Sequence, residues 1–239
     1  MTRELTLKAN LDREEVDNHE LRIICTNSES YPSRRPSDNS YLTISVTVND
    51  VNDNSPTFEY KNYAVGVSET DTRGKNLLTL KADDPDLNDV VTYRILNDSI
   101  TVTDDNLNNV KDTAFLLNQV TGALELNFQV QSYMKGYFEF QVEARDLVDN
   151  IDVATVKVYL VAEANRVTFI FMNNVEVVRG VDQTVFAAIF SAAYESECVI
   201  DEILASVFDG KVQEGLTDVR VHFVKNNEAL EAREILELR

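Results

Sequence analysis

The stretch VTVNDVNDNSPTFEY, residues 46–60, decides the fold class of this chain. Residues 43–48 alternate apolar and polar side chains, which predicts a β-strand. Four small oxygen-bearing side chains follow the strand, and Pro56 stiffens the exit from them. These four are Asp50, Asn52, Asp53 and Asn54. Carboxylate and amide oxygens are the hard ligands that Ca²⁺ prefers. We therefore interpret the segment as a metal-binding linker rather than a flexible hinge.

Other acidic residues repeat this chemistry elsewhere in the chain. Asp12 and Glu14 lie in LDRE, and Asp84 and Asp86 lie in ADDPD. Residues two apart on an extended segment point to the same side, so each pair can present two carboxylates together. Asp146 closes a further strand-like run, QVEARD. These acids are candidates to join the linker in one metal site.

Most of the chain shows a period of two between apolar and polar residues. The strand-length runs are LRIIC, YLTISVTV, YAVGVSE, NLLTLKA, VVTYRIL, GALELNF, YFEFQVEA and VATVKVYLV. Short strands separated by turn residues predict an antiparallel β-sandwich. From about residue 167 the pattern changes, with strands at 166–173 and 217–224, and helices at 181–194 and 227–239. Residues 199–208 fit either structure, so this last segment predicts a small two-layer α+β domain.

Composition limits the function classes. The chain has 239 residues, of which 41 are acidic and 22 basic, and its net charge of −19 argues against nucleic acid as a partner. No apolar run is long enough to span a bilayer, and both ends read as interrupted elements, so we expect a soluble piece of a longer protein. Cys25 and Cys198 are the only cysteines. They fall in different predicted domains, which argues against an internal disulfide, and two cysteines are too few for a cysteine-rich zinc site.

Four motifs carry a resemblance to a known family. They are LDRE, DVNDNSP, ADDPD and VEARD, at residues 11–14, 50–56, 82–86 and 142–146. In this order they resemble the calcium motifs of cadherin repeats. The resemblance implies a mainly β fold, with Greek-key sandwich repeats followed by a small ferredoxin-like α+β domain. Residues 1–54 would be the C-terminal half of one repeat, residues 55–163 a complete repeat, and residues 164–239 a membrane-adjacent domain.

The resemblance also implies the ligands of shared Ca²⁺ ions. They would be Asp12, Glu14, Asp50, Asn52, Asp53, Asn54, Asp84, Asp86, Asn88 and Asp146. The metal would stiffen the rod and would not catalyse a reaction. At the far end of the complete repeat, Glu69 matches a ligand of the next junction, but no second DxNDNxP motif follows. We therefore expect no complete calcium cluster near residues 160–166, Glu69 as a solvated carboxylate, and a joint held by packing.

Residues 122–146, GALELNFQVQSYMKGYFEFQVEARD, resemble the membrane-proximal repeat of insect midgut cadherins. In that family this region binds bacterial insecticidal crystal (Cry) toxins, and the resemblance maps the toxin-binding positions onto Leu124, Phe128 and Gln129. It implies a membrane-anchored adhesion protein with this segment on the extracellular face, homophilic cadherin contacts, and use as a toxin receptor. The alternative is a mechanosensory tip-link type of cadherin with a purely structural role.

The same stretch suggests how a toxin could bind. Leu124 and Phe128 lie on one strand face, which we expect to point into the core, and residues 129–136 read as a turn. If this strand lies at a sheet edge, its unpaired backbone groups could accept a partner. A core role for these two residues is compatible with sensitivity to toxin, because their loss would deform the edge.

The remaining polar features have simpler interpretations. Asn97 begins an N-glycosylation motif, Asn-Asp-Ser. Residues 104–112 read as a mobile loop, and His19 and His222 as ordinary surface or strand residues. The sequence has no HExxH motif or phosphate-binding loop, and its carboxylate pairs gather at a linker rather than in a cleft. We therefore expect no enzymatic activity.

Overall fold

The computed structural model describes residues 5–24 and 41–237. The chain divides into two compact units. The first runs up to Asn54 and also includes Asp84–Asp89, and the second comprises Ser55–Asp83 and Val90–Arg239. The short stretch Asp84–Asp89, called the acidic loop below, therefore groups with the linker at residues 50–54 and not with the strands on either side of it.

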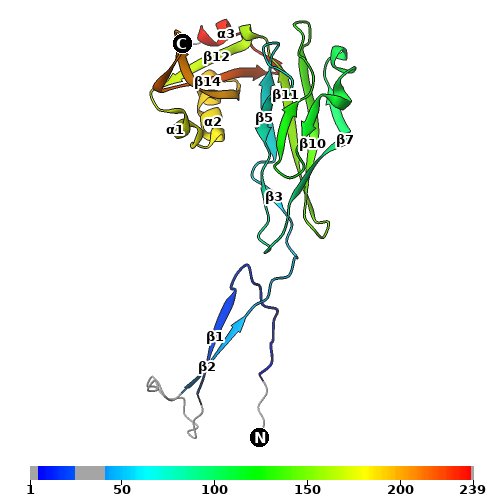
Figure 1. The fold of residues 1–239 in the computed structure, drawn as a ribbon, viewed down its shortest axis with the longest axis vertical. Helices are drawn as coiled ribbons and strands as arrows, with labels where there is room; N and C mark the ends of the chain where they lie inside the picture. The colour runs from blue at the N-terminus through cyan, green and yellow to red at the C-terminus, as the bar shows by residue number, and fades with distance from the viewer. Residues whose placement is uncertain (1–4, 25–40, 238–239) are drawn as a thin grey trace. The chain divides into compact units, whose positions relative to one another are not determined.

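In the first unit, β1 (Asn18–Ile24) pairs with β2 (Tyr41–Thr47) in an antiparallel hairpin (Figure 1). The pair closes at Asn18 and Thr47, whose hydroxyl donates a hydrogen bond of 3.0 Å to Asn18 Oδ1. One residue further on, Val48 N donates to Asp17 O at 2.9 Å. These bonds fix the start of the linker beside the turn at residues 12–17.

The second unit begins with a β-sandwich. Its four-stranded sheet has the order β4-β11-β10-β7, and its three-stranded sheet has the order β5-β9-β8, with β3 and β6 forming a short extra pair. The bounds are β3 Thr57–Phe58, β4 Asn62–Val67, β5 Asn76–Thr79, β6 Ala82–Asp83, β7 Thr92–Val102, β8 Phe115–Leu117, β9 Ala123–Leu126, β10 Gly136–Arg145 and β11 Ile151–Leu160. All pairs are antiparallel except β11 with β4.

The sandwich core is apolar and rich in aromatic side chains. Leu124, Leu126, Phe138 and Phe140 are each at most 1% exposed, and the Phe115 ring contacts Phe138 edge-on at 5.1 Å. The inward side of each alternating strand supplies these residues, as the period of two predicts. This confirms the predicted mainly β fold.

A tyrosine holds the strands that flank the acidic loop. The Tyr93 hydroxyl, on β7, accepts a hydrogen bond of 2.9 Å from the backbone of Ala82 on β6, and the Tyr93 ring is buried. Nearby, Gly122 adopts a φ of +69°, and a Cβ there would overlap the carbonyl oxygen of Leu80. This turn therefore requires glycine.

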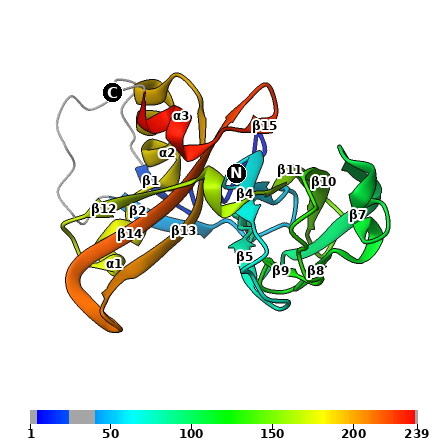
Figure 2. The same cartoon turned by 90° about the horizontal axis from the view of Figure 1, so that it is seen from above.

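A three-stranded sheet of order β12-β14-β13 follows the sandwich, and α1 and α2 cover one face of it (Figure 2). The bounds are η3 Glu163–Asn165, β12 Arg166–Phe171, α1 Val175–Arg179, α2 Gln183–Tyr194, β13 Glu197–Phe208, β14 Lys211–Lys225, β15 Glu228–Ala229 and α3 Ala232–Leu236. The β12–α–β13–β14 order matches part of a ferredoxin-like domain. Its core includes the stacked rings of Phe169 and Phe190, whose centroids are 4.3 Å apart.

The structure resolves one ambiguous segment and revises two local predictions. Residues 199–208, ambiguous in sequence, belong to strand β13, and the predicted helix at 227–239 is only the short α3, preceded by β15. The loop at 104–112 contains two 3₁₀ turns, η1 (Asp105–Leu107) and η2 (Lys111–Thr113), and Leu107 is fully buried. That buried leucine anchors a segment predicted to be mobile. None of the helices in the described part of the chain is both long and apolar enough to cross a bilayer.

Candidate metal centre

Asp12 shapes the turn that presents Glu14. Its Oδ1 accepts hydrogen bonds from the backbone of Glu14 at 2.9 Å and of Glu15 at 3.2 Å. A short acidic side chain that bonds to backbone two or three residues later stabilises a tight turn. Asp12 therefore orients Glu14 through the backbone.

The linker and the acidic loop are joined mainly through one side chain. Asp86 accepts two hydrogen bonds from Asn54, at 2.9 Å from its backbone and at 2.7 Å from its side-chain amide. Asp50 accepts a further bond of 3.1 Å from the backbone of Leu87. Within the loop, Asp84 accepts from the backbone of Asp86 at 3.0 Å. The DVNDNSP and ADDPD motifs are thus in direct contact.

These contacts gather an acidic triad, Glu14, Asp53 and Asp86. One carboxylate oxygen of each residue lies within 4.8 Å of the others. Asp86 is buried, whereas Glu14 and Asp53 are exposed. Burial alone would raise the pKa of Asp86, but the hydrogen bonds from Asn54 and the nearby Arg13 lower it on balance. Asp86 is therefore ionised at neutral pH, as a metal ligand must be.

The donor set fits a hard cation. Asn52 Oδ1 is buried and is one of the polar atoms in the described residues with no hydrogen-bond partner. A buried carbonyl oxygen without a donor is costly, and coordination to a cation would satisfy it. Carboxylates together with an amide oxygen suit Ca²⁺ better than a soft metal.

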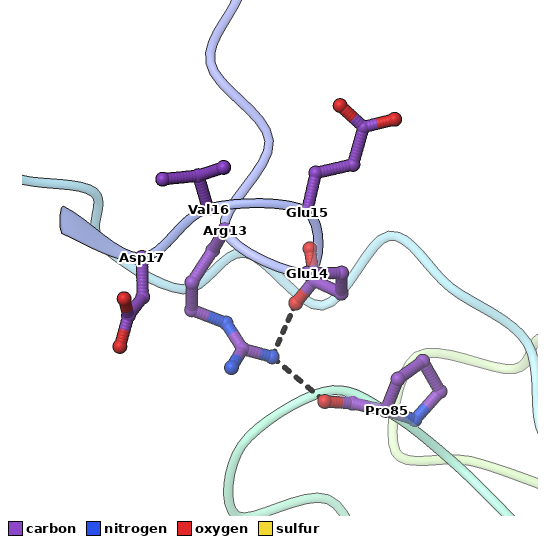
Figure 3. Close-up of a pocket in the computed structure, with 6 residues that line it drawn as sticks. All are labelled: Arg13, Glu14, Glu15, Val16, Asp17 and Pro85. Atoms are coloured by element: carbon purple, nitrogen blue, oxygen red, sulfur yellow. Dashed lines mark hydrogen bonds and ion pairs between the residues drawn. The ribbon is translucent and has the colours of Figure 1, made fainter. Parts of the chain in front are cut away.

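Arg13 is one of the residues that line a neighbouring pocket, which Figure 3 shows. Its guanidinium forms ion pairs with Glu14 Oε1 and, at 2.5 Å, with Asp50 Oδ1, and it donates a hydrogen bond of 2.7 Å to the carbonyl oxygen of Pro85. Two predicted metal ligands therefore already share a fixed positive charge. Sequence reasoning missed this role, although a basic residue between two acids in LDRE was the available signal.

The predicted ligands fall into two groups. The first unit contains Asp12, Glu14, Asp50, Asn52, Asp53, Asn54, Asp84, Asp86 and Asn88. Asn88 is exposed and has a φ of +62°, so it serves the turn of the acidic loop. Asp146 belongs to the second unit, where its carboxylate accepts bonds from Val148 N at 2.9 Å and Asn150 N at 2.7 Å. Its part in the metal site stays a prediction.

The predicted toxin-binding residues lie mostly inside the sandwich. Leu124 is fully buried, Phe128 is 8% exposed, and β9 lies between β5 and β8. The idea that this strand presents an unpaired edge is therefore wrong, because both of its backbone edges are hydrogen bonded. Gln129 is exposed, and its amide donates to the carbonyl oxygens of Glu69 and Asp71. The accessible part of the region is the following turn, where Tyr133 is 63% exposed.

The remaining predicted positions differ from one another in solvent exposure. Asn97 lies on β7, and both Asn97 and Glu69 are exposed. Glycosylation of Asn97 stays a prediction. His222 is not at the surface: it is fully buried, with Nδ1 2.7 Å from Asp201 Oδ1. Burial, followed by the charge of Asp201, raises the pKa of the Cys198 thiol to about 12. Cys25 lies outside the described residues.

Comparison with known proteins identifies the fold and its relatives. Residues 138–238 match the family model of the cadherin-23 alpha/beta domain. The chain is 40% identical to Cadherin-AgCad1 of Anopheles gambiae over 97% of its length, and 32% identical to human protocadherin gamma-A8 over 60%. It spans 14% of the length of each of these two relatives.

Solved structures show the same architecture. Extracellular cadherin domains 3–6 of protocadherin gamma B2 superpose with a TM-score of 0.51 at 20% identity, covering 68% of this chain and 37% of that one. At this identity the likeness concerns the fold alone. The sandwich topology, the order of the four acidic motifs and the identity to the mosquito protein lead to one conclusion: the chain belongs to the cadherin family.

Proposed function

We propose that this chain is a non-catalytic extracellular cadherin segment that Ca²⁺ stiffens at residues 50–54. The arrangement of oxygen atoms around the linker carries the proposal. An oxygen from each member of the acidic triad lies within 4.8 Å of the others, and the buried Asn52 Oδ1 lies in the same linker without a hydrogen-bond donor. Ca²⁺ supplies the positive charge that lets these like-charged oxygens stay together.

The mechanism follows from how the ligands are connected. Glu14 belongs to the turn before β1, Asp53 to the linker, and Asp86 to the acidic loop. The acidic loop is covalently continuous with β6 and β7 of the second unit, which the Tyr93 hydroxyl ties together. Fixing the loop to the linker therefore restricts rotation about residues 54–56. The result is a spacer that resists bending, which suits adhesion and cadherin–cadherin contacts at a cell surface.

Arg13 is expected to weaken calcium binding. It forms ion pairs with Glu14 and Asp50, and a carboxylate oxygen engaged by a guanidinium is less available to a metal ion. Substituting Arg13→Gln should raise the affinity for calcium several-fold, and isothermal titration calorimetry measures the change. Arg22→Gln is the matched control, because Arg22 pairs with Glu20 on exposed β1. Equal or weaker binding by Arg13→Gln would show that Arg13 supports the site.

The same titration tests the proposal itself. The wild-type chain should give saturable heats with calcium and much weaker heats with magnesium, which dehydrates reluctantly and demands a stricter geometry. Absence of calcium binding at millimolar concentrations would refute calcium stiffening for this chain.

A second proposed function is that of receptor for a bacterial Cry toxin. The stretch at residues 122–146 and the 40% identity to an insect cadherin favour it. We place the contact on the exposed turn that includes Tyr133 and Lys135, since Leu124 and Phe128 are buried. The structural alternative, a spacer of the tip-link type, requires the same metal centre but no toxin contact, so toxin capture separates the two.

A further inference from the structure

A single buried guanidinium links the sandwich to the α/β domain (residues 166–237) inside the second unit. Arg166 is the first residue of β12, and its side chain is only 3% exposed. It contacts Glu163 Oε1 at 2.9 Å, Asp201 Oδ2 at 3.3 Å and Asp71 Oδ2 at 3.5 Å, and it donates to Ser68 Oγ at 3.0 Å. Ser68 and Asp71 follow β4 of the sandwich, whereas Asp201 lies on β13. One cation thus bridges acids from both sides of the joint.

Asp71 remains ionised beside this cation. Burial alone would raise the pKa of Asp71, but Lys75, the backbone of Ser68 and Arg166 lower it on balance. Lys75 also pairs with Glu202 on β13, which adds a second ionic bridge across the joint. Asp201 accepts from Arg166 and faces the buried His222.

Close packing surrounds the ionic cluster. Gly66 lies on β4, and a Cβ there would overlap Asp201 Oδ1 and lie 2.8 Å from Val161 Cγ2. Its φ is not positive, so space and not backbone conformation requires glycine. A small apolar cluster adds to the same joint, and its buried members are Tyr159, Val161, Val199 and Val224. The Tyr60 hydroxyl, from the segment before β4, donates to Asp182 Oδ1 at the start of α2 at 3.1 Å.

We propose that Arg166 is the fixed cation of a permanent, metal-independent joint. The four acids of the cluster, Asp71, Glu163, Asp201 and Glu202, are each paired with a basic side chain of the same chain, namely Arg166, Lys75 or Arg220. A divalent ion would have to displace a buried guanidinium that bridges several acids, which is unfavourable. The chain therefore combines one connection that depends on calcium, at residues 50–54, with one that does not. The α/β domain keeps its orientation on the sandwich whatever the calcium concentration.

Distance measurements between spin labels test this joint. Cysteines replace exposed Asp98 on β7 and Lys211 at the β13–β14 turn, in a Cys25→Ser, Cys198→Ala background. We expect one narrow distance distribution that is the same in calcium and in EDTA. Arg166→Met should lose the narrow distribution, Arg166→Lys should retain part of it, and Gly66→Ala should shift it. Arg94→Met is the control, because Arg94 pairs with Glu143 within the sandwich.

The outcomes separate this inference from the calcium proposal. Broadening of the wild-type distribution in EDTA, or an unchanged narrow distribution in Arg166→Met, would overturn it. If Arg166→Met lacks the native circular dichroism spectrum, the distance distribution is measured instead on the double variant Arg166→Met, Asp201→Asn. This variant removes both charges of the pair and leaves Asp71 paired with Lys75. Failure of the chain to bind calcium would refute the stiffening mechanism and leave the joint untouched.

Discussion

Replacing Asp53 and Asp86 together by asparagine abolishes the rise in melting temperature that calcium gives the wild-type chain. A ligand at one hundred times its Kd stabilises the folded state by about 2.7 kcal/mol. For a chain of this size that corresponds to a shift of roughly 5–10 °C. Asparagine keeps the shape of both side chains but removes two of the three charges of the acidic triad, so the metal loses its main attraction.

Thermal melts followed by circular dichroism, in calcium and in EDTA, measure this effect. The charge-matched control is Asp98→Asn with Asp112→Asn, since both residues are exposed on the sandwich. The control should keep the full calcium shift. An undiminished shift in the Asp53→Asn, Asp86→Asn variant would place the calcium site elsewhere.

Leu124→Ala should lower the free energy of unfolding by about 2–5 kcal/mol, the usual range for a leucine truncated in a packed core. Leu124 is fully buried on the central strand of its sheet, between Leu78 on β5 and Leu117 on β8. Since the total stability of a domain is about 5–15 kcal/mol, this single change removes a large part of it. Urea unfolding followed by fluorescence or circular dichroism measures the loss.

Tyr133→Ala is the matched surface variant. The side chain is 63% exposed, so its truncation should change stability by no more than about 0.5 kcal/mol. If the turn after β9 binds a Cry toxin, Tyr133→Ala lowers toxin capture while folding stays intact. Loss of capture in Leu124→Ala alone, with Tyr133→Ala binding as the wild type does, would remove the turn from the proposed contact.

The clustering of the acidic motifs could be predicted because the motifs are local. Asp50 to Asn54 follow a clear strand signal, and small oxygen-bearing side chains in such a linker have few other uses. The pairing of Asn54 with Asp86 is compatible with that prediction, but its geometry depends on the acidic loop grouping with the first unit. The role of Arg13 depends on the same tertiary arrangement, so a short motif does not reveal it.

Position within a sheet was harder to predict. Alternation around Leu124 correctly indicates that the side chain points inward, but the same alternation occurs in central and edge strands. Only the pairing of β9 with both β5 and β8 distinguishes them. His222 is a similar case, because a histidine in a strand gives no sign that a second domain will cover it.

A crystal structure grown with calcium, or with an anomalously scattering lanthanide in its place, tests metal binding by the acidic triad most directly. We expect an anomalous peak coordinated by Glu14, Asp53 and Asp86. Peaks confined to other acidic surfaces, with this triad bonded only to protein or water, would contradict it.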